Sequence, residues 1–249
     1  MTLPHALGTY PYLVTGVLWF CGLLLVVRSL GLASHRRLIV RAGLIMVPNS
    51  LFSLAHRDYW DPIRVGGWPL GPEDALFAFN VGAMGCLAIL LFSRNRLLVA
   101  DQPVPHLGRL LAAGIPAQCA FVVAILLGRS SMTSMILVQL LAVVALLLLR
   151  PDLWQFSATG AIVFSPIYFC IVEGVFWIWP RFVSCWASAP PWGLRWFGIP
   201  LGEIAWAISF GLFWPLFAAF AFDLRLCSSR PSGQRAADSA CRVCHARSK

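Results

Sequence analysis

Hydrophobic stretches of about 20 residues recur along the whole chain, and each is long enough to cross a lipid bilayer as a helix. Short polar segments separate them, among them residues 35–37 and 150–152. Hydrophobic residues make up 59% of the 249 positions and charged residues only 12%, which is about half the charged share of an ordinary soluble domain. The sequence therefore predicts an all-α, polytopic membrane helical bundle.

We expect about seven transmembrane helices, arranged as two parallel three-helix repeats plus a linking helix. The expected spans are residues 10–33, 38–55, 72–93, 107–127, 131–149, 154–178 and 199–223. The expected domains are a first repeat at 1–100, a linking span at 101–130, a second repeat at 131–223 and a disordered cytoplasmic tail at 224–249.

The repeat is indicated by two acidic motifs, each of which follows a Trp-rich loop and opens a hydrophobic span. Both motifs enter the membrane from the same side if the spans are numbered as above, so the repeat is parallel and brings both acids to one depth. An offset of 129 positions (203 minus 74) aligns Asp74 with Glu203, Phe77 with Trp206, Asn80 with Ser209 and Gly82 with Gly211.

Four acids at or near the ends of spans are the candidate catalytic residues: Glu73, Asp74, Glu173 and Glu203. A charged side chain inside a membrane helix costs roughly 2.5–3.5 kcal/mol on insertion scales, so such residues usually serve a function. The alternative is helix capping, because acids are favoured in the first helical turn. Asp74 and Glu203 closely follow Pro72 and Pro200, which keeps both interpretations open.

A carboxylic acid that keeps its proton in an apolar pocket can act as a general acid on an apolar substrate. Aromatic side chains near the motifs could stabilise a carbocation by cation–π attraction, although ordinary helix packing explains them equally well. Asn80 and Ser209 could orient a reacting group or could join helices by hydrogen bonds. The candidate substrate-binding residues are Phe77, Phe79, Asn80, Trp206, Ser209 and Phe210.

Residues 72–77, Pro-Glu-Asp-Ala-Leu-Phe, resemble the Pro-Glu-Glu/Asp-x-x-Phe motif of the small membrane lycopene cyclases, the heterodimeric bacterial type and its fused archaeal and fungal relatives. Residues 200–206, Pro-Leu-Gly-Glu-Ile-Ala-Trp, resemble the second motif of that family. The resemblance implies two three-span units joined by a linking span. It also implies acid-initiated cyclisation of linear carotenoid ends, an isomerisation without net redox change.

The second motif departs from the family pattern at two positions. Gly202 stands where the family usually has its first Glu, and Trp206 stands where Phe is common. Two alternatives to a cyclase therefore stay open: a proton-coupled membrane carrier, and a non-catalytic membrane protein that binds carotenoid or lipid. The expected partners are the bilayer and an apolar, lycopene-like polyene, while the oligomeric state, homo- or hetero-oligomer, is open.

Fourteen basic residues lie on the C-terminal side of the expected topology and five on the other side. The positive-inside rule then places the C-terminus in the cytoplasm and the N-terminus outside, in a bacterial-type inner membrane. The net charge of +9 is spread over loops and helix ends, which argues against nucleic acid as a partner. Tryptophans are expected at the outer interface: Trp60, Trp68, Trp177, Trp179, Trp186, Trp192 and Trp196.

Two polar segments carry further candidate groups. In the loop 56–62, Asp58 and Asp61 are expected to be solvated. In the tail, Cys241, Cys244 and His245 match the Cys-x-x-Cys-His pattern of covalent haem sites. We interpret that match as chance, because a tail of this length is too short to enclose a haem. A zinc or redox site formed together with Cys227 is the alternative. No cofactor and no metal site are expected.

Overall fold

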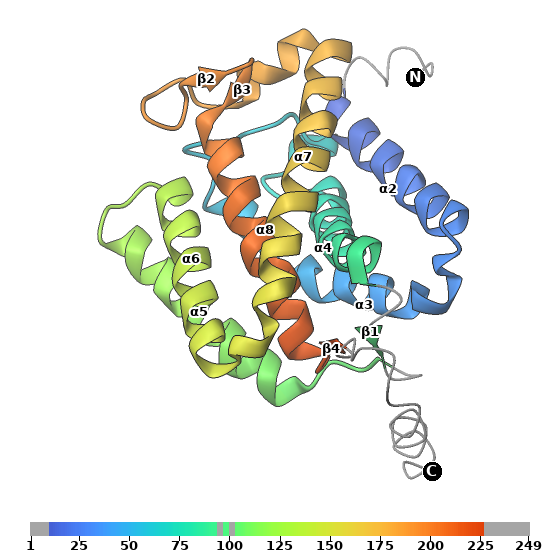
Figure 1. Ribbon diagram of the computed structural model, residues 1–249. Coiled ribbons are helices and arrows are strands. Elements are labelled where there is room, and N and C mark those ends of the chain that lie inside the picture. The colour runs from blue at the N-terminus through green and yellow to red at the C-terminus, as the bar shows by residue number, and fades with distance from the viewer. Residues whose placement is uncertain (1–9, 94–96, 100–102, 227–249) are drawn as a thin grey trace, which may run out of the picture.

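The computed structural model describes residues 10–93, 97–99 and 103–226. Within these ranges, seven helical segments are long and apolar enough to cross a membrane, which confirms the predicted all-α polytopic bundle (Figure 1). The helices are α2 (Pro11–Ser29), α3 (Arg36–Met46), α4 (Pro72–Ser93), α5 (Leu107–Leu126), α6 (Ser131–Leu149), α7 (Trp154–Ile178) and α8 (Leu201–Ala221). The 3₁₀ helices are η1 (Leu32–His35), η2 (Val47–Leu54), η3 (Val65–Gly67), η4 (Pro151–Leu153) and η5 (Pro180–Cys185).

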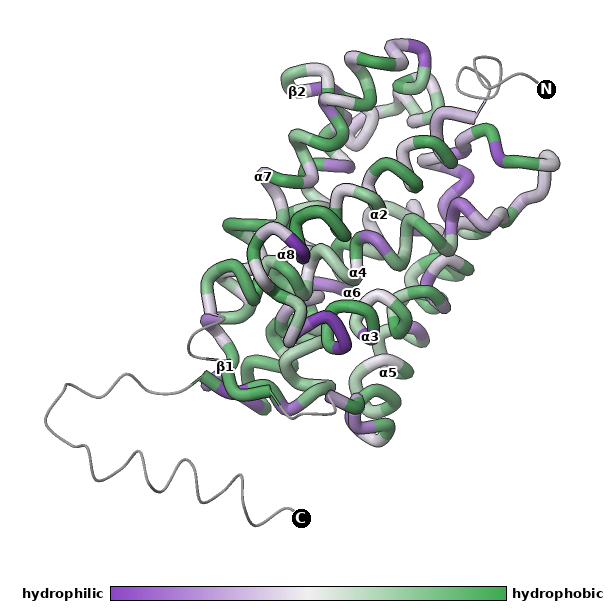
Figure 2. The backbone as a smooth tube through the Cα atoms, turned by 90° about the vertical axis from the view of Figure 1, so that its right-hand side faces the viewer, coloured by the Kyte–Doolittle hydropathy of each residue, from purple (hydrophilic) through white to green (hydrophobic). Residues whose placement is uncertain are grey.

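The outer surface of the bundle is apolar. Leu126, Leu148 and Trp177 are at least 80% exposed, and hydrophobic residues follow the helices along their length (Figure 2). Exposed apolar surface on this scale is incompatible with water and suits a lipid environment. The chain is an integral membrane protein.

The second span is not one continuous α-helix. The sequence predicted a span at 38–55, whereas the structure builds residues 32–54 from η1, α3 and η2. Pro48 lies at the start of η2 and has no backbone N–H, so the α-helical hydrogen-bond pattern of α3 ends just before it. The 3₁₀ segment that follows turns its residues toward the inside of the bundle, where several of them line a cavity.

Helices α4 and α8 form the centre of the bundle. Each is buried along most of its length, whereas the other spans expose most of theirs. Helix α4 packs against α2 and α3, α8 packs against α6 and α7, and α4 and α8 pack against each other. Helix α5 lies at the periphery against α6 and α8 (Figure 1). In each predicted repeat the third helix, α4 or α8, therefore packs against both of the other two helices.

Residues aligned by the internal repeat make equivalent contacts. Asn80 on α4 donates a hydrogen bond of 2.8 Å to the carbonyl of Gly16 on α2. Its counterpart Ser209 on α8 donates one of 2.6 Å to Gln139 on α6. In both halves this position joins the third span to the first.

The aligned glycines serve the second span in the same way. A Cβ on Gly82 would lie 2.9 Å from the carbonyl oxygen of Ala42 on α3, and one on Gly211 would lie 3.0 Å from the Cα of Ala161 on α7. Both glycines therefore let the central helix approach the backbone of the second span closely. These parallels support the two-repeat arrangement; its domain boundaries stay a prediction.

The two central helices meet through a tryptophan. Trp214 on α8 donates a hydrogen bond of 2.9 Å from its indole Nε1 to the carbonyl of Gly82 on α4. The same ring lies over Gly85, where an added Cβ would come within 2.5 Å of the indole. Contact between the repeats thus depends on small residues on α4 and one large residue on α8.

Two Trp-containing loops pair through their backbones at the end of the bundle where α4 and α8 begin. Trp60 and Trp186 form an antiparallel bridge. The amide of Asp61 donates to the carbonyl of Cys185 at 2.9 Å, and the amide of Ala187 donates to that of Tyr59 at 2.7 Å. Beside them, β2 (Arg195–Trp196) and β3 (Ile199–Pro200) form a small hairpin that leads into α8 (Figure 1). Together these loops close one end of the bundle.

The expected disordered tail begins with ordered structure. Leu224 is buried, and β4 (Arg225–Leu226) pairs antiparallel with β1 (Leu97–Leu98). The remainder of the tail, with Cys241, Cys244 and His245, lies outside the described residues.

The contact between α7 and α8 yields a stability prediction. A Cβ on Gly160 would overlap the carbonyl oxygen of Gly211 and the ring of Pro215, whereas a Cβ on Gly174 of the same helix meets no atom within 4 Å. We expect Gly160→Ala to cost about 1–3 kcal/mol through overpacking, and Gly174→Ala to leave stability unchanged. Thermal unfolding of the detergent-solubilised variants measures both. Equal midpoints for the two variants would contradict this packing.

Candidate functional site

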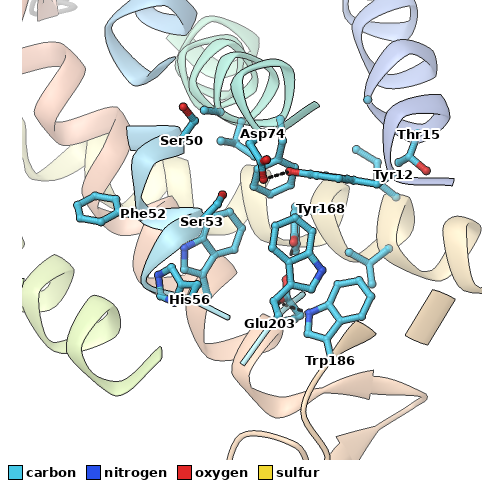
Figure 3. A pocket seen from close by; sticks show the side chains of 18 of the residues that line it. Tyr12, Thr15, Ser50, Phe52, Ser53, His56, Asp74, Tyr168, Trp186 and Glu203 are labelled. Atoms are coloured by element: carbon cyan, nitrogen blue, oxygen red, sulfur yellow. Dashed lines mark hydrogen bonds between the residues drawn. The ribbon is translucent and has the colours of Figure 1, made fainter. Parts of the chain in front are cut away.

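A largely apolar cavity of about 130 Å³ lies between the two repeats, next to the paired loops (Figure 3). It is lined by residues of α2, η2, α4, α6, α7 and α8 and of both loops. One acid from each motif, Asp74 from α4 and Glu203 from α8, lines it. The polar or aromatic residues around it include Tyr12, Trp19, His56, Tyr59, Trp60, Phe77, Tyr168, Trp186 and Trp206.

Asp74 is held by an arginine that the sequence gave no reason to select. Arg64 donates to both carboxylate oxygens, from Nε to Oδ2 at 2.8 Å and from Nη2 to Oδ1 at 3.3 Å. The amide of Gly71 donates to Oδ2 at 2.8 Å, and the hydroxyl of Tyr12 donates to Oδ1 at 3.3 Å. Both oxygens are occupied, and the arginine neutralises the negative charge.

The Arg64 side chain is itself almost fully buried, at 3% exposure. Burial alone would lower the pKa of its guanidinium, but hydrogen bonds and the charge of Asp74, with a further bond to Asp61, raise that pKa above its usual value. The cation therefore stays charged, and its side chain also lies 6.0 Å from the ring of Trp60. The pair fixes the loop 61–71 to the start of α4.

Glu73 is buried but lies outside the cavity. One oxygen, Oε1, accepts a hydrogen bond of 2.6 Å from the amide of Val65. The other, Oε2, has no hydrogen-bond partner within the part of the chain that the structure describes. The side chain therefore ties the loop back to the helix start through Val65 in η3, and it does not line the cavity with Asp74.

Glu203 has a different environment. The hydroxyl of Tyr168 donates to Oε2 at 2.5 Å, and the indole Nε1 of Trp186 donates to Oε1 at 2.7 Å. The residue is 7% exposed. No cationic side chain among residues 10–93, 97–99 and 103–226 forms an ion pair with it. Its partners are neutral donors, so a proton on the carboxyl group itself is the means of neutralising this acid.

Gly202 occupies its position because of Tyr59. A Cβ on Gly202 would overlap the Tyr59 hydroxyl and come within 2.5 Å of its ring. Burial, and after it the charge of Glu203, raise the pKa of the Tyr59 phenol well above its ordinary value. The space that a larger residue at 202 would need is thus filled by a protonated phenol close to Glu203.

The aligned aromatic residues of the two motifs meet at the cavity. The rings of Phe77 and Trp206 lie 6.1 Å apart, centroid to centroid. Phe77 also packs against Trp60 at 5.8 Å, and Trp206 against Tyr168 at 5.0 Å. Aromatic faces from both repeats therefore surround the space between the two acids.

The other predicted site residues lie away from the cavity. Glu173 is exposed on α7. Phe79 packs on Phe20 and covers Gly43, while Phe210 stacks between aromatic rings of α8. Asn80 and Ser209 join helices by the hydrogen bonds given above, which is their alternative interpretation.

Several residues that contact the acids were missed from sequence. Tyr12, Arg64, Tyr168 and Trp186 belong to neither motif and are separated from their partners by 10 to 62 positions. No local pattern marks them, because the contacts arise only when the helices and loops pack.

Of the two polar segments with further candidate groups, the loop 56–62 keeps Asp58 and Asp61 exposed, as expected, and both side chains also make polar contacts. Asp61 pairs with Arg57 and Arg64, and Asp58 bonds to Ser131 at the start of α6. Within the described residues, no group of three or more His, Cys, Asp or Glu side chains could hold a metal ion.

The fold and the site thus define an integral membrane bundle with two repeat-related acids in one aromatic cavity. A protein-family model described as "Lycopene cyclase" matches residues 130–221, which comprise α6, α7 and α8. The match confirms the resemblance and is consistent with a divergent member of the lycopene cyclase family. It supports a carotenoid cyclase-like function for the chain. No curated protein and no solved structure matched.

The buried ion pair gives a second prediction. Arg64→Met would leave the Asp74 carboxylate buried without its counter-charge, which costs about 3–5 kcal/mol. The double variant Arg64→Met/Asp74→Leu removes both charges and should recover most of that loss. Arg57→Met is the control, since its pair with Asp61 is exposed and contributes little. Thermal unfolding in detergent measures all three; a double variant no more stable than Arg64→Met would refute the pairing.

Proposed function

We propose that this protein cyclises the end groups of a linear, lycopene-like carotenoid, with Glu203 as the acid that starts the reaction. The observation that carries the proposal is the contrast between the two cavity acids. Asp74 is neutralised by Arg64, whereas Glu203 has only neutral donors around it. Of the two, Glu203 is the acid that can carry a transferable proton.

The reaction balances as an isomerisation. The Glu203 carboxyl group gives its proton to one carbon of the terminal double bond, and a carbocation forms on the neighbouring carbon. A second double bond of the chain attacks this cation, so a ring closes and the positive charge moves to a ring carbon. Loss of a proton from an adjacent carbon forms the ring double bond. No oxidant or reductant is needed.

The cavity supports each charged stage. Tyr168 and Trp186 donate to the carboxylate that remains when Glu203 has lost its proton, and such preformed donors stabilise developing charge. Phe77 and Trp206 line the cavity with their rings 6.1 Å apart, and cation–π attraction to such rings contributes about 2 kcal/mol or more in a desolvated site. The apolar lining keeps out most of the water that would capture the cation.

The size of the cavity fits one end of a polyene. A cavity needs about 10–15 Å³ to hold one water molecule. The 130 Å³ of this cavity therefore has room for a compact apolar group but not for a whole carotenoid. The rest of the substrate would extend into the lipid. In this proposal Asp74, paired with Arg64, holds the loop 61–71 against the start of α4, and Glu73 and Glu173 have no contact with the bound end group.

The test uses cells that accumulate lycopene. We expect the protein to produce cyclised carotenoid, and Glu203→Gln to reduce the yield at least a hundredfold while the protein stays folded, since general acid catalysis contributes 10² to 10⁴-fold. Glu173→Gln, on an exposed face, is the control and should match the wild type. Pigment chromatography and gel filtration give both readouts.

Three outcomes would contradict this assignment. Ring formation at wild-type yield in Glu203→Gln would remove Glu203 from the mechanism. Co-purified but unchanged lycopene with the wild-type protein would favour a binding protein. Neither product nor bound pigment would leave the proton-coupled carrier as the better hypothesis.

We further propose an orientation in a bacterial-type inner membrane, with the paired loops and the acidic motifs at the outer side and the C-terminus in the cytoplasm. The excess of basic residues at the opposite end supports it. Tryptophans of the two loops, among them the 70%-exposed Trp68 and the 60%-exposed Trp196, suit an interfacial position.

Labelling of single cysteines tests this orientation. In a background without native cysteines, Ser188→Cys lies in the exposed loop before β2, and Ser34→Cys lies in η1 between α2 and α3. A membrane-impermeant maleimide should label Ser188→Cys in intact cells and Ser34→Cys only after permeabilisation. The reverse pattern would invert the proposed topology.

A further inference from the structure

His56 lies in the loop two residues after the end of η2 and is 6% exposed. Its ring Nδ1 is 2.7 Å from the hydroxyl oxygen of Ser131, the first residue of α6. That hydroxyl donates its own proton to Oδ1 of Asp58, and the amide of Ser131 donates to Oδ2 at 3.1 Å. These contacts join the loop 55–71 to the second repeat.

The direction of these bonds fixes the tautomer of the imidazole. Since the Ser131 proton goes to the Asp58 carboxylate, the Ser131 oxygen is left as an acceptor for His56. Nδ1 therefore carries the hydrogen, and Nε2 presents a free lone pair. His56 lines the cavity that holds Glu203 (Figure 3), and its Nε2 is buried with no partner within the described residues.

Such an atom needs an explanation, because a buried acceptor without a partner costs about 1–3 kcal/mol. Burial lowers the pKa of His56 to about 4, although the charge of Asp58 acts in the opposite direction. The ring is therefore neutral at physiological pH. The imidazole has a free lone pair on Nε2. On its other side, the Asp58 carboxylate, reached through Ser131, would stabilise the ring once Nε2 is protonated.

We propose that His56 Nε2 is the base that ends the cyclisation. This inference rests on the proposed function. The C–H bond beside the cationic ring carbon breaks, its electron pair forms the ring double bond, and the proton moves to Nε2. Asp58, acting through Ser131, offsets the charge of the imidazolium. The imidazolium and the Glu203 carboxylate then exchange this proton within the cavity, which restores both groups.

The other acids of the motifs are poorer acceptors. Both oxygens of Asp74 are occupied, and its charge is paired with Arg64. Glu73 does not line the cavity. Glu203 is the remaining competitor, but the carbon that gains a proton and the carbon that loses one are different atoms of the substrate. His56, at a different place in the same cavity, can take the proton from the second carbon while Glu203 stays where it gave its proton to the first carbon.

The experiment compares His56→Ala with wild type and Glu203→Gln in detergent-solubilised protein supplied with lycopene. We expect His56→Ala to lower kcat at least tenfold and to yield some hydroxylated ring product, because water captures a cation that no base quenches. Added imidazole should restore activity to His56→Ala and not to Glu203→Gln. His106→Gln, at an exposed position, is the control and should behave as wild type.

The outcomes separate the two proposals. If wild-type protein cyclises lycopene and His56→Ala does so at the same rate with the same products, His56 is not the base and the proposed function stands. A loss of activity that imidazole does not restore, in a variant that remains monodisperse, also overturns the assignment of His56. If the wild type itself forms no ring, the proposed function fails and this inference fails with it.

Discussion

The contact between α4 and α8 is the constraint on which the rest of the structure depends. Trp214 reaches across to the backbone of Gly82, and the small residues of α4 leave room for its ring. In a bilayer the hydrophobic effect does not press helices together, so close packing and hydrogen bonds of this kind hold them. Because both motifs start these two helices, the contact also brings Asp74 and Glu203 to one cavity.

The two acids of the cavity have different environments, because Asp74 is paired with a cation and Glu203 is not. A buried carboxylate must be paired, hydrogen-bonded or protonated. Asp74 receives an arginine and two further donors, whereas Glu203 receives a phenol and an indole. One acid thus becomes a fixed charge that organises the loop 61–71. The other has only neutral donors around it, and it is the acid to which we assign the transferable proton.

The loops at this end of the bundle complete the site as much as the helices do. They supply Tyr59, Arg64 and Trp186, and the bridge between Trp60 and Trp186 fixes one loop against the other. Tyr59 also explains the departure at Gly202, since its phenol fills the space beside that residue. The second motif and the first loop therefore pack directly against each other. A residue larger than glycine at position 202 would require Tyr59 to move or to be replaced by a smaller residue.

The sequence by itself determined the fold class, because a chain so poor in charge and so rich in long apolar segments can satisfy its backbone only as membrane helices. The parallel repeat, with its offset of 129, also predicted that both motifs lie at one depth in the membrane, and the structure brings Asp74, Glu203, Phe77 and Trp206 to one cavity. Only the tertiary structure decided which acid is neutralised. Arg64, Tyr168 and Trp186 reach the acids through packing between distant segments, and burial and charge pairing depend on distance in space, which local sequence patterns do not encode.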